Sequence, residues 1–121
     1  MKNLFVYIAG PIHGLENRSA NMEGLKDTFY KLIRAGIPAH ISETYSKEVL
    51  NCCSDLLVIM YKGFVDDRIS HNAIDFARAN GITVTALNPD EVSNLDNFIT
   101  VLRNRTTEGA NKPDKGKGSN R

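Results

Sequence analysis

The chain has 121 residues, of which 41% are hydrophobic and 24% charged, and its formal net charge is +1. These values are typical of one globular domain. The near-neutral charge argues against a dedicated nucleic-acid-binding protein, which usually has a clear basic excess. No apolar stretch is long enough to span a membrane. The two cysteines are adjacent and match no zinc-binding spacing, and the apolar run near the N-terminus is too short for a secretory signal, so we expect a reduced, cytoplasmic protein without a metal or other cofactor.

Hydrophobic spacing predicts alternating strands and helices in the first half of the chain. The β-rich run at residues 4–8 predicts the first strand. Apolar residues recur at helical spacing over residues 19–35, and Gly36 is placed to end that helix. Residues 37–42 predict a second, weak strand, and residues 46–54 predict a short helix.

The second half of the chain continues this alternation. Residues 55–61 are apolar nearly throughout, which is typical of a central parallel strand that is covered on both faces. After a loop, Ser70 is placed to cap a helix that runs to Asn80, and residues 82–88 predict a fourth strand. The tripeptide NPD at residues 88–90 predicts the start of a last helix, with proline near its first position.

Strands that alternate with helices predict an α/β fold, a Rossmann-like three-layer sandwich with a mainly parallel sheet of four to five strands. Residues 1–105 would form this domain. Residues 106–121 contain no large apolar residue and have four basic against two acidic residues, so we expect a disordered basic tail. Because such sheets bind ligands at the carboxyl ends of their strands, the loops after the first and third strands are the candidate site.

The first of these loops, AGPIHGLENRS, contains two glycines and a proline. Gly10 and Gly14 would let backbone N–H groups approach a ligand oxygen beside the N-terminus of the next helix. Pro11 stiffens the turn, and His13 and Asn17 add polar groups. The loop matches neither the Walker A pattern nor the dinucleotide-binding pattern, and an ordinary turn explains the same residues.

Other candidate ligand contacts come from the first strand and from the second loop, KGFVDDRIS. Tyr7 lies in the strand and is a core residue in the alternative interpretation. Phe64 is either a lid or an edge of the core, and Arg68 could contact a phosphate. Ser70 lies at the start of the following helix. We count these four side chains among the residues that could bind a ligand.

Three segments together resemble the nucleoside 2-deoxyribosyltransferase-like superfamily, in particular its small phage-associated branch that begins YIxGPIxG. They are YIAGPIHG, CSDLLVIMYKGF and AIDFARANGITV, and the similarity covers about two-thirds of the chain. The resemblance implies a five-stranded Rossmann-like sheet that binds nucleosides or nucleotides at its carboxyl edge. It implies cleavage of the N-glycosidic bond by a glutamate, whose carboxylate suits an oxocarbenium-like transition state. It also implies a homodimer or larger homo-oligomer.

The chain departs from this family at its catalytic helix. A gapless alignment places the catalytic glutamate at Ala73, whose methyl group cannot act as a nucleophile, and a family glycine at Ile69. Asp67 or Asp66 could swing in as a substitute carboxylate. His71 lies in the first helical turn, where the helix dipole favours a neutral imidazole that could act as a base. These last three residues are the catalytic candidates.

Three functions remain open from the sequence. The first is a nucleoside- or nucleotide-binding protein that has lost the glycosidase nucleophile. The second is an active N-glycosidase or deoxyribosyltransferase that uses Asp67 or Asp66. The third is a phage-encoded interaction factor that acts on a host protein and uses the fold only as a scaffold. The expected partners are a nucleoside, a nucleotide or a nucleotide-derived molecule, with no membrane or nucleic-acid partner.

Overall fold

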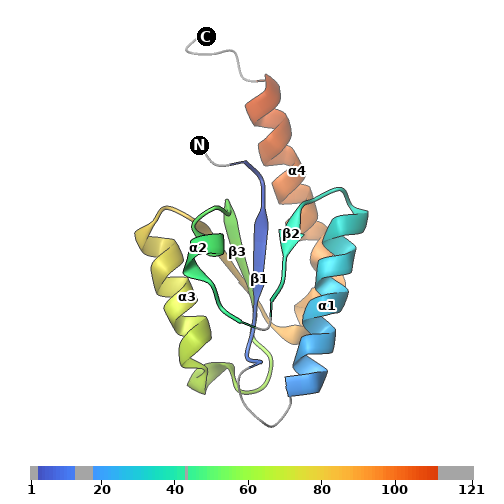
Figure 1. Cartoon of the computed structure of the whole chain (residues 1–121). Helices are drawn as coiled ribbons and strands as arrows, with labels where there is room; N and C mark the ends of the chain where they lie inside the picture. Colours follow the sequence, from blue (N-terminus) through green and yellow to red (C-terminus); the bar gives the residue numbers. More distant parts are fainter. Residues whose placement is uncertain (1–2, 13–17, 43, 112–121) are drawn as a thin grey trace.

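The computed structural model describes residues 3–12, 18–42 and 44–111, and all side chains in these ranges except those of residues 93, 94 and 106–111. Its centre is a four-stranded parallel sheet in the order β2-β1-β3-β4. Helices cover both faces, so the chain forms the Rossmann-like three-layer α/β sandwich predicted from the sequence (Figure 1). The strands are β1 (Val6–Ala9), β2 (Ala39–His40), β3 (Asp55–Ile59) and β4 (Thr83–Leu87).

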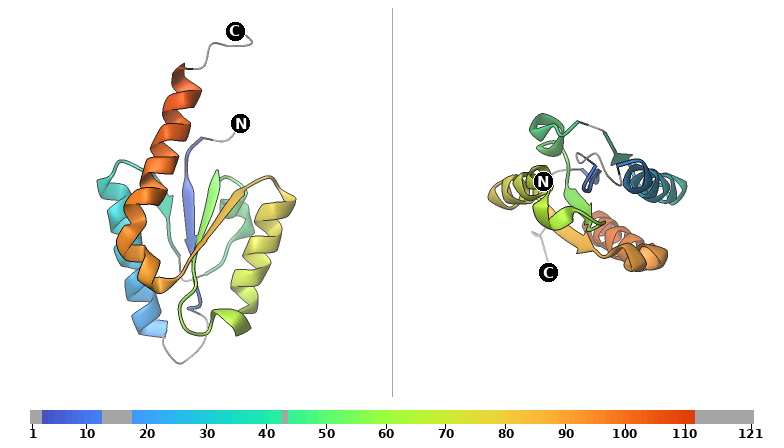
Figure 2. Two further views of the ribbon diagram at one scale, coloured as in Figure 1. Left: turned by 180° about the vertical axis from the view of Figure 1, so that it is seen from behind. Right: turned by 90° about the horizontal axis from the view of Figure 1, so that it is seen from below.

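Two helices lie on each face of the sheet, with α1 and α4 on one side and α2 and α3 on the other (Figure 2). The α-helices are α1 (Arg18–Arg34), α2 (Lys47–Leu50), α3 (Arg68–Ala79) and α4 (Leu95–Asn111), and two 3₁₀ helices are η1 (Phe64–Asp66) and η2 (Pro89–Asn94). Helix α4 continues through residues 106–111, which we had expected in a disordered tail. Residues 112–121 lie outside the described residues.

The core consists of two hydrophobic clusters, one on each face of the sheet. Successive side chains of a strand point to opposite faces. Leu56 and Val58 therefore pack toward α2 and α3, whereas Leu57 and Ile59 pack toward α1 and α4. All of β3 is buried, which confirms the predicted central strand. Ile33, one of the apolar residues whose spacing predicted the first helix, does not belong to this core and is 44% exposed.

One predicted helix start is wrong, and another is right in place but differs in helix type. Ser70 is not an N-cap, because α3 begins at Arg68 and Asp67 occupies the N-cap position. The last helical segment begins as predicted at Pro89, but it starts as the 3₁₀ helix η2 before α4 follows. The backbone N–H of Asn88 donates to Glu91 Oε1 at 2.7 Å, a contact typical of a capping box.

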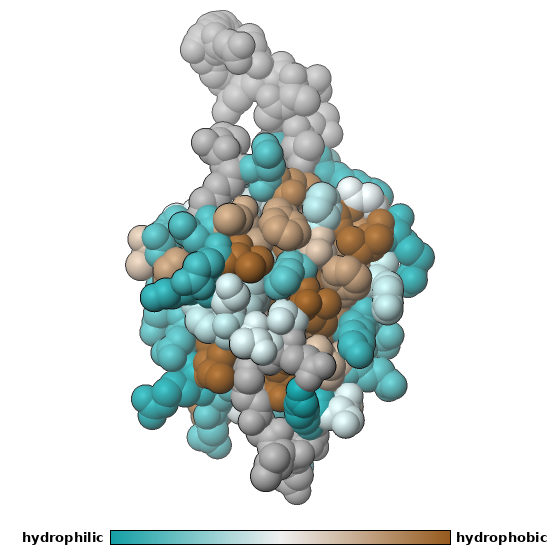
Figure 3. Space-filling view, viewed as in Figure 1, coloured by the Kyte–Doolittle hydropathy of each residue, from teal (hydrophilic) through white to brown (hydrophobic). Residues whose placement is uncertain are grey.

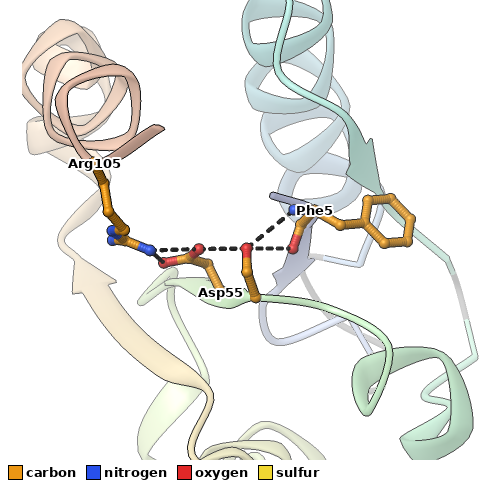
Figure 4. Close-up of polar contacts among 4 residues, drawn as sticks. Phe5, Asp55 and Arg105 are labelled. Atoms are coloured by element: carbon orange, nitrogen blue, oxygen red, sulfur yellow. Dashed lines mark hydrogen bonds and ion pairs between the residues drawn. The ribbon is translucent and has the colours of Figure 1, made fainter. Parts of the chain in front are cut away.

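A polar cluster connects α4 to the amino edge of the sheet, which is the end at which the parallel strands begin (Figure 4). Asp55 is fully buried, and Arg105 Nη1 lies 3.1 Å and 3.0 Å from its two carboxylate oxygens. Ser54 Oγ donates to Asp55 Oδ2 at 2.6 Å and accepts the backbone N–H of Phe5 at 3.0 Å. The cluster therefore connects α4, β3 and the start of β1.

The surface matches this layered arrangement. On the face seen in Figure 1, hydrophobic residues gather near the middle, between the more hydrophilic helical flanks (Figure 3). The short strand β2 lies there, and Ala39 and Ile41 are only partly buried. Within the described part of the chain, no helix combines the length and the apolar character that crossing a membrane would require.

Candidate functional site

A cavity lies beside β1, at the point where the chain stops adding strands on one side of β1 and adds the next strand on its other side. The chain passes from β1 through α1 to β2, and then returns to β3 on the other side of β1. Open α/β sheets bind ligands at such a switch point, beside the carboxyl ends of the strands. The described residues that line the cavity are Tyr7, Ile8, Ala9, Gly10, Ile12, Leu25, Ser42, Tyr45, Ile69, Ser70 and Ala73.

The cavity is narrow inside and open at its mouth. It contains about 310 Å³ of empty space when the solvent-filled mouth is included, but only about 20 Å³ lies far enough from protein atoms to hold a water molecule. That inner space is enough for about one water. A ligand larger than a few atoms would therefore have most of its volume at the mouth.

The bend after β1 forms one wall of the cavity. Gly10 is buried there, and a Cβ at this position would lie 3.1 Å from Leu25 Cδ2 and 3.2 Å from the carbonyl oxygen of Ile59. The close approach of α1 and of the end of β3 thus accounts for this glycine without any ligand. Pro11 is also buried. His13, Gly14 and Asn17 lie outside the described residues.

Asn21 connects the two loops at the carboxyl edge of the sheet. Its side-chain nitrogen donates to the carbonyl oxygen of Pro11 at 2.8 Å and to that of Lys62 at 3.2 Å, and the residue is only 5% exposed. We did not identify this residue from the sequence. A signal was present, since Asn21 lies one helical turn before the buried Leu25 on the inner side of α1.

Two tyrosines, Tyr7 and Tyr45, line the cavity. Tyr7 is only 3% exposed, and its hydroxyl oxygen accepts the backbone N–H of Ser46 at 3.1 Å. The ring of Tyr45 lies 6.4 Å from that of Tyr7, edge to face. Burial raises the pKa of both phenols, so both are neutral hydroxyls at pH 7. Tyr45 was not predicted from the sequence, because it belongs to no recognisable motif.

Ser70 contributes a buried hydroxyl from the first turn of α3. It is 2% exposed and donates its hydroxyl proton to the carboxylate of Asp67. Because this proton is engaged, the Ser70 oxygen is left to accept a hydrogen bond from a ligand. Asp67 does not belong to the cavity wall among the described residues. Its carboxylate is in contact with Ser70, which does.

The other candidates from the second loop also lie away from the described cavity wall. Asp66 and Arg68 are exposed. His71 Nε2 lies 3.0 Å from the carbonyl oxygen of Phe64 and 3.2 Å from that of Val65. Since carbonyl oxygens only accept hydrogen bonds, this nitrogen must donate and is not free to act as a base. The Phe64 ring lies 4.7 Å from the imidazole and packs at the edge of the core.

The two positions at which the sequence departs from the resembled family both face the cavity. Ile69 and Ala73 are one helical turn apart on α3, and both line the wall. Ala73 is 1% exposed. A glutamate at position 73 would thus lie next to the cavity, but the methyl group of Ala73 cannot act as a nucleophile. No carboxylate belongs to the wall among the described residues.

Within the ranges that the structure describes, no three or more His, Cys, Asp or Glu side chains are grouped so that they could hold a metal ion.

No protein-family model, curated protein or solved structure matches the chain. Comparison with known proteins thus assigns no ligand or activity to this site.

Proposed function

We propose that the chain binds a nucleoside or a nucleotide-derived small molecule in this cavity without breaking its N-glycosidic bond. The observation that carries the proposal is the cavity at the switch point of the sheet. Its wall combines apolar side chains with hydroxyl-bearing residues from three segments, and no described carboxylate belongs to it. The resemblance of the first-strand loop to nucleoside-processing proteins supports the same class of ligand.

The chemistry of the wall suits a sugar attached to a flat ring. Sugar hydroxyls both donate and accept hydrogen bonds, so one can donate to the Ser70 oxygen while a neutral tyrosine hydroxyl donates to another. The side chains of Ile8, Ile12 and Ile69 supply apolar contact. Because the interior is narrow, the sugar edge would enter the cavity and the base would remain at the mouth.

Binding without cleavage follows from the lack of a placed nucleophile among the described residues. Retaining glycosidases need a carboxylate beside the anomeric carbon. The carboxylate of Asp67 is engaged with the Ser70 hydroxyl, and Asp66 is exposed in η1. An active glycosidase built on either residue would release free base, and Asp67→Asn or Asp66→Asn would abolish that release.

A thermal-unfolding screen with nucleosides, nucleotides and cyclic nucleotides tests the proposal. A ligand at about a hundred times its dissociation constant stabilises the folded chain by about 2.7 kcal/mol, which is easily measured. Chromatography of the same samples shows whether the base has been released. Stabilisation with intact ligand supports the proposal, whereas release of free base, or no stabilisation by any compound, contradicts it. The last result would favour the protein-interaction alternative.

Matched substitutions assign the binding to the cavity. We expect Ser70→Ala and Tyr45→Phe each to weaken ligand binding by about tenfold, because each removes about one hydrogen bond. Ser19→Ala and Tyr30→Phe make the same chemical changes at exposed positions of α1 and should leave binding unchanged. Equal effects of the matched pairs would show that the ligand binds elsewhere.

A further inference from the structure

The outer edge of β4 has no neighbouring strand within the described part of the chain. β4 is the last strand in the order β2-β1-β3-β4. Viewed from behind, it runs between α3 and α4 with no element drawn in front of it (Figure 2, left). An uncovered edge of this kind offers backbone hydrogen-bonding groups to another chain.

The register identifies which backbone groups face outward. Thr83 N–H donates to the Ser54 carbonyl at 3.2 Å, and Met60 N–H donates to the Leu87 carbonyl at 2.8 Å. In a strand, the backbone groups of alternate residues point to opposite sides. Thr83, Thr85 and Leu87 therefore bond to β3, while the N–H and C=O groups of the two residues between them, 84 and 86, point away from the sheet.

The sequence of this edge contains none of the usual protection against pairing. Proteins block exposed edges with charged residues, proline or very short strands. β4 reads TVTAL, with no charge and no proline, and Thr83 and Ala86 are exposed. The opposite edge is different, because β2 has only two residues and follows Pro38.

We propose that β4 is an association surface for a second copy of this chain, which pairs with it in antiparallel orientation about a two-fold axis at Thr85. This register places Val84 of one copy opposite Ala86 of the other, and each such pair exchanges both backbone hydrogen bonds. The occupant of the edge is a second copy because the strand is uncharged and complementary to itself, so that pairing brings no like charges together.

The side chains next to the edge fit this arrangement. Thr85 meets Thr85 of the partner as a pair without backbone hydrogen bonds, in which Cβ atoms are about 5 Å apart and threonine pairs are favourable. Val84 and Phe76 are only partly buried on the α3 side, and a second copy would cover them further. The resulting continuous sheet does not depend on the ligand of the cavity.

The test measures association over a range of protein concentrations by sedimentation or light scattering. We expect a concentration-dependent dimer, since pairing of one short strand is a small interface. Ala86→Lys places a charge on the edge and should weaken dimerisation at least about tenfold. Ala20→Lys makes the same change at an exposed position of α1 and should have no effect. A monomer at every concentration, or equal effects of the two lysines, would overturn the proposal.

Disulfide trapping tests the register independently. Thr85→Cys in a Cys52→Ser background, which removes the exposed native thiol, should form a covalent dimer under mild oxidation. Thr83→Cys in the same background lies opposite Leu87 of the partner, so it should not. A dimer that forms without cross-linking at position 85 excludes this pairing. A monomer whose amides at 84 and 86 resist hydrogen exchange would mean that the edge is already covered within one chain, which also overturns the proposal.

Discussion

Loss of the Arg105 guanidinium is the most direct test of how the fold is held together at its amino edge. Arg105→Met keeps the aliphatic part of the side chain on α4 but removes the two hydrogen bonds to the carboxylate of Asp55. The carboxylate remains fully buried and keeps the hydrogen bond from Ser54 Oγ at 2.6 Å. A buried charge without its counter-ion is one of the few changes with a large cost.

The magnitude follows from the burial of the two partners. Breaking a fully buried ion pair costs about 3–5 kcal/mol, but the Arg105 side chain is 43% exposed, so solvent replaces part of the lost interaction and we expect about 2 kcal/mol. For a chain of this size that corresponds to a fall in Tm of about 6–10 °C. Urea unfolding at pH 7 should show a lower midpoint with an unchanged slope.

Two further variants make this prediction refutable. Arg103→Met is the matched control, because Arg103 is exposed on the same helix and donates to a backbone carbonyl oxygen, that of Ala35, at 2.8 Å. Adding Asp55→Asn to Arg105→Met removes the unpaired charge and should recover part of the lost stability. The reasoning is wrong if Arg103→Met is as destabilising as Arg105→Met, or if the double variant is less stable than Arg105→Met.

Three other predictions concern the carboxyl edge and the β2 side of the sheet. Asn21→Ala removes both hydrogen bonds that join the two loops and should cost about 1–3 kcal/mol in urea unfolding, whereas Asn72→Ala at an exposed position should cost little. Gly24→Ala would place a Cβ 2.0 Å from the Tyr61 hydroxyl; it should destabilise the chain, yet stabilise a Tyr61→Ala variant by about 0.5–1 kcal/mol through helix propensity. Burial lowers the pKa of His40 from its ordinary 6.5, so the unfolded chain binds the proton more readily. Stability should therefore fall as the pH drops below about 6.5, and it should fall less in His40→Gln when the urea midpoints at neutral and acidic pH are compared.

The layers of the fold were predictable because each element has a strong periodic signal. The nearly continuous apolar run predicted as a central strand is recovered as β3, which is buried throughout. Element ends were less predictable, since capping depends on contacts within a few residues. Ser70 has the residue type of an N-cap, but it bonds to Asp67, which occupies that position itself.

The candidate site was predictable in place but not in composition. Parallel strands bring their carboxyl ends together, which is why the bend at Gly10 and the start of α3 meet at one cavity. Which side chains face that cavity depends on the rotation of α3. It turns Ile69, Ser70 and Ala73 inward, whereas His71 on the same helix is exposed. Asp66 lies before α3, in η1, and is also exposed. Side-chain contacts such as that of Asn21 with two loop carbonyls have no sequence motif.

The two ends of the sheet can be perturbed separately. Asp55 begins β3 at the amino edge, while the carbonyl of Ile59 ends the same strand beside Gly10 and the cavity. Arg105→Met should therefore lower stability without altering ligand affinity, because its contacts lie at the edge of the sheet remote from the cavity. Ser70→Ala should lower ligand affinity, and it should also cost some stability because it removes the hydrogen bond to Asp67. If Arg105→Met also abolished ligand binding in the folded protein, β3 would have to transmit the change along its length, and the cavity could not be treated as a preformed site.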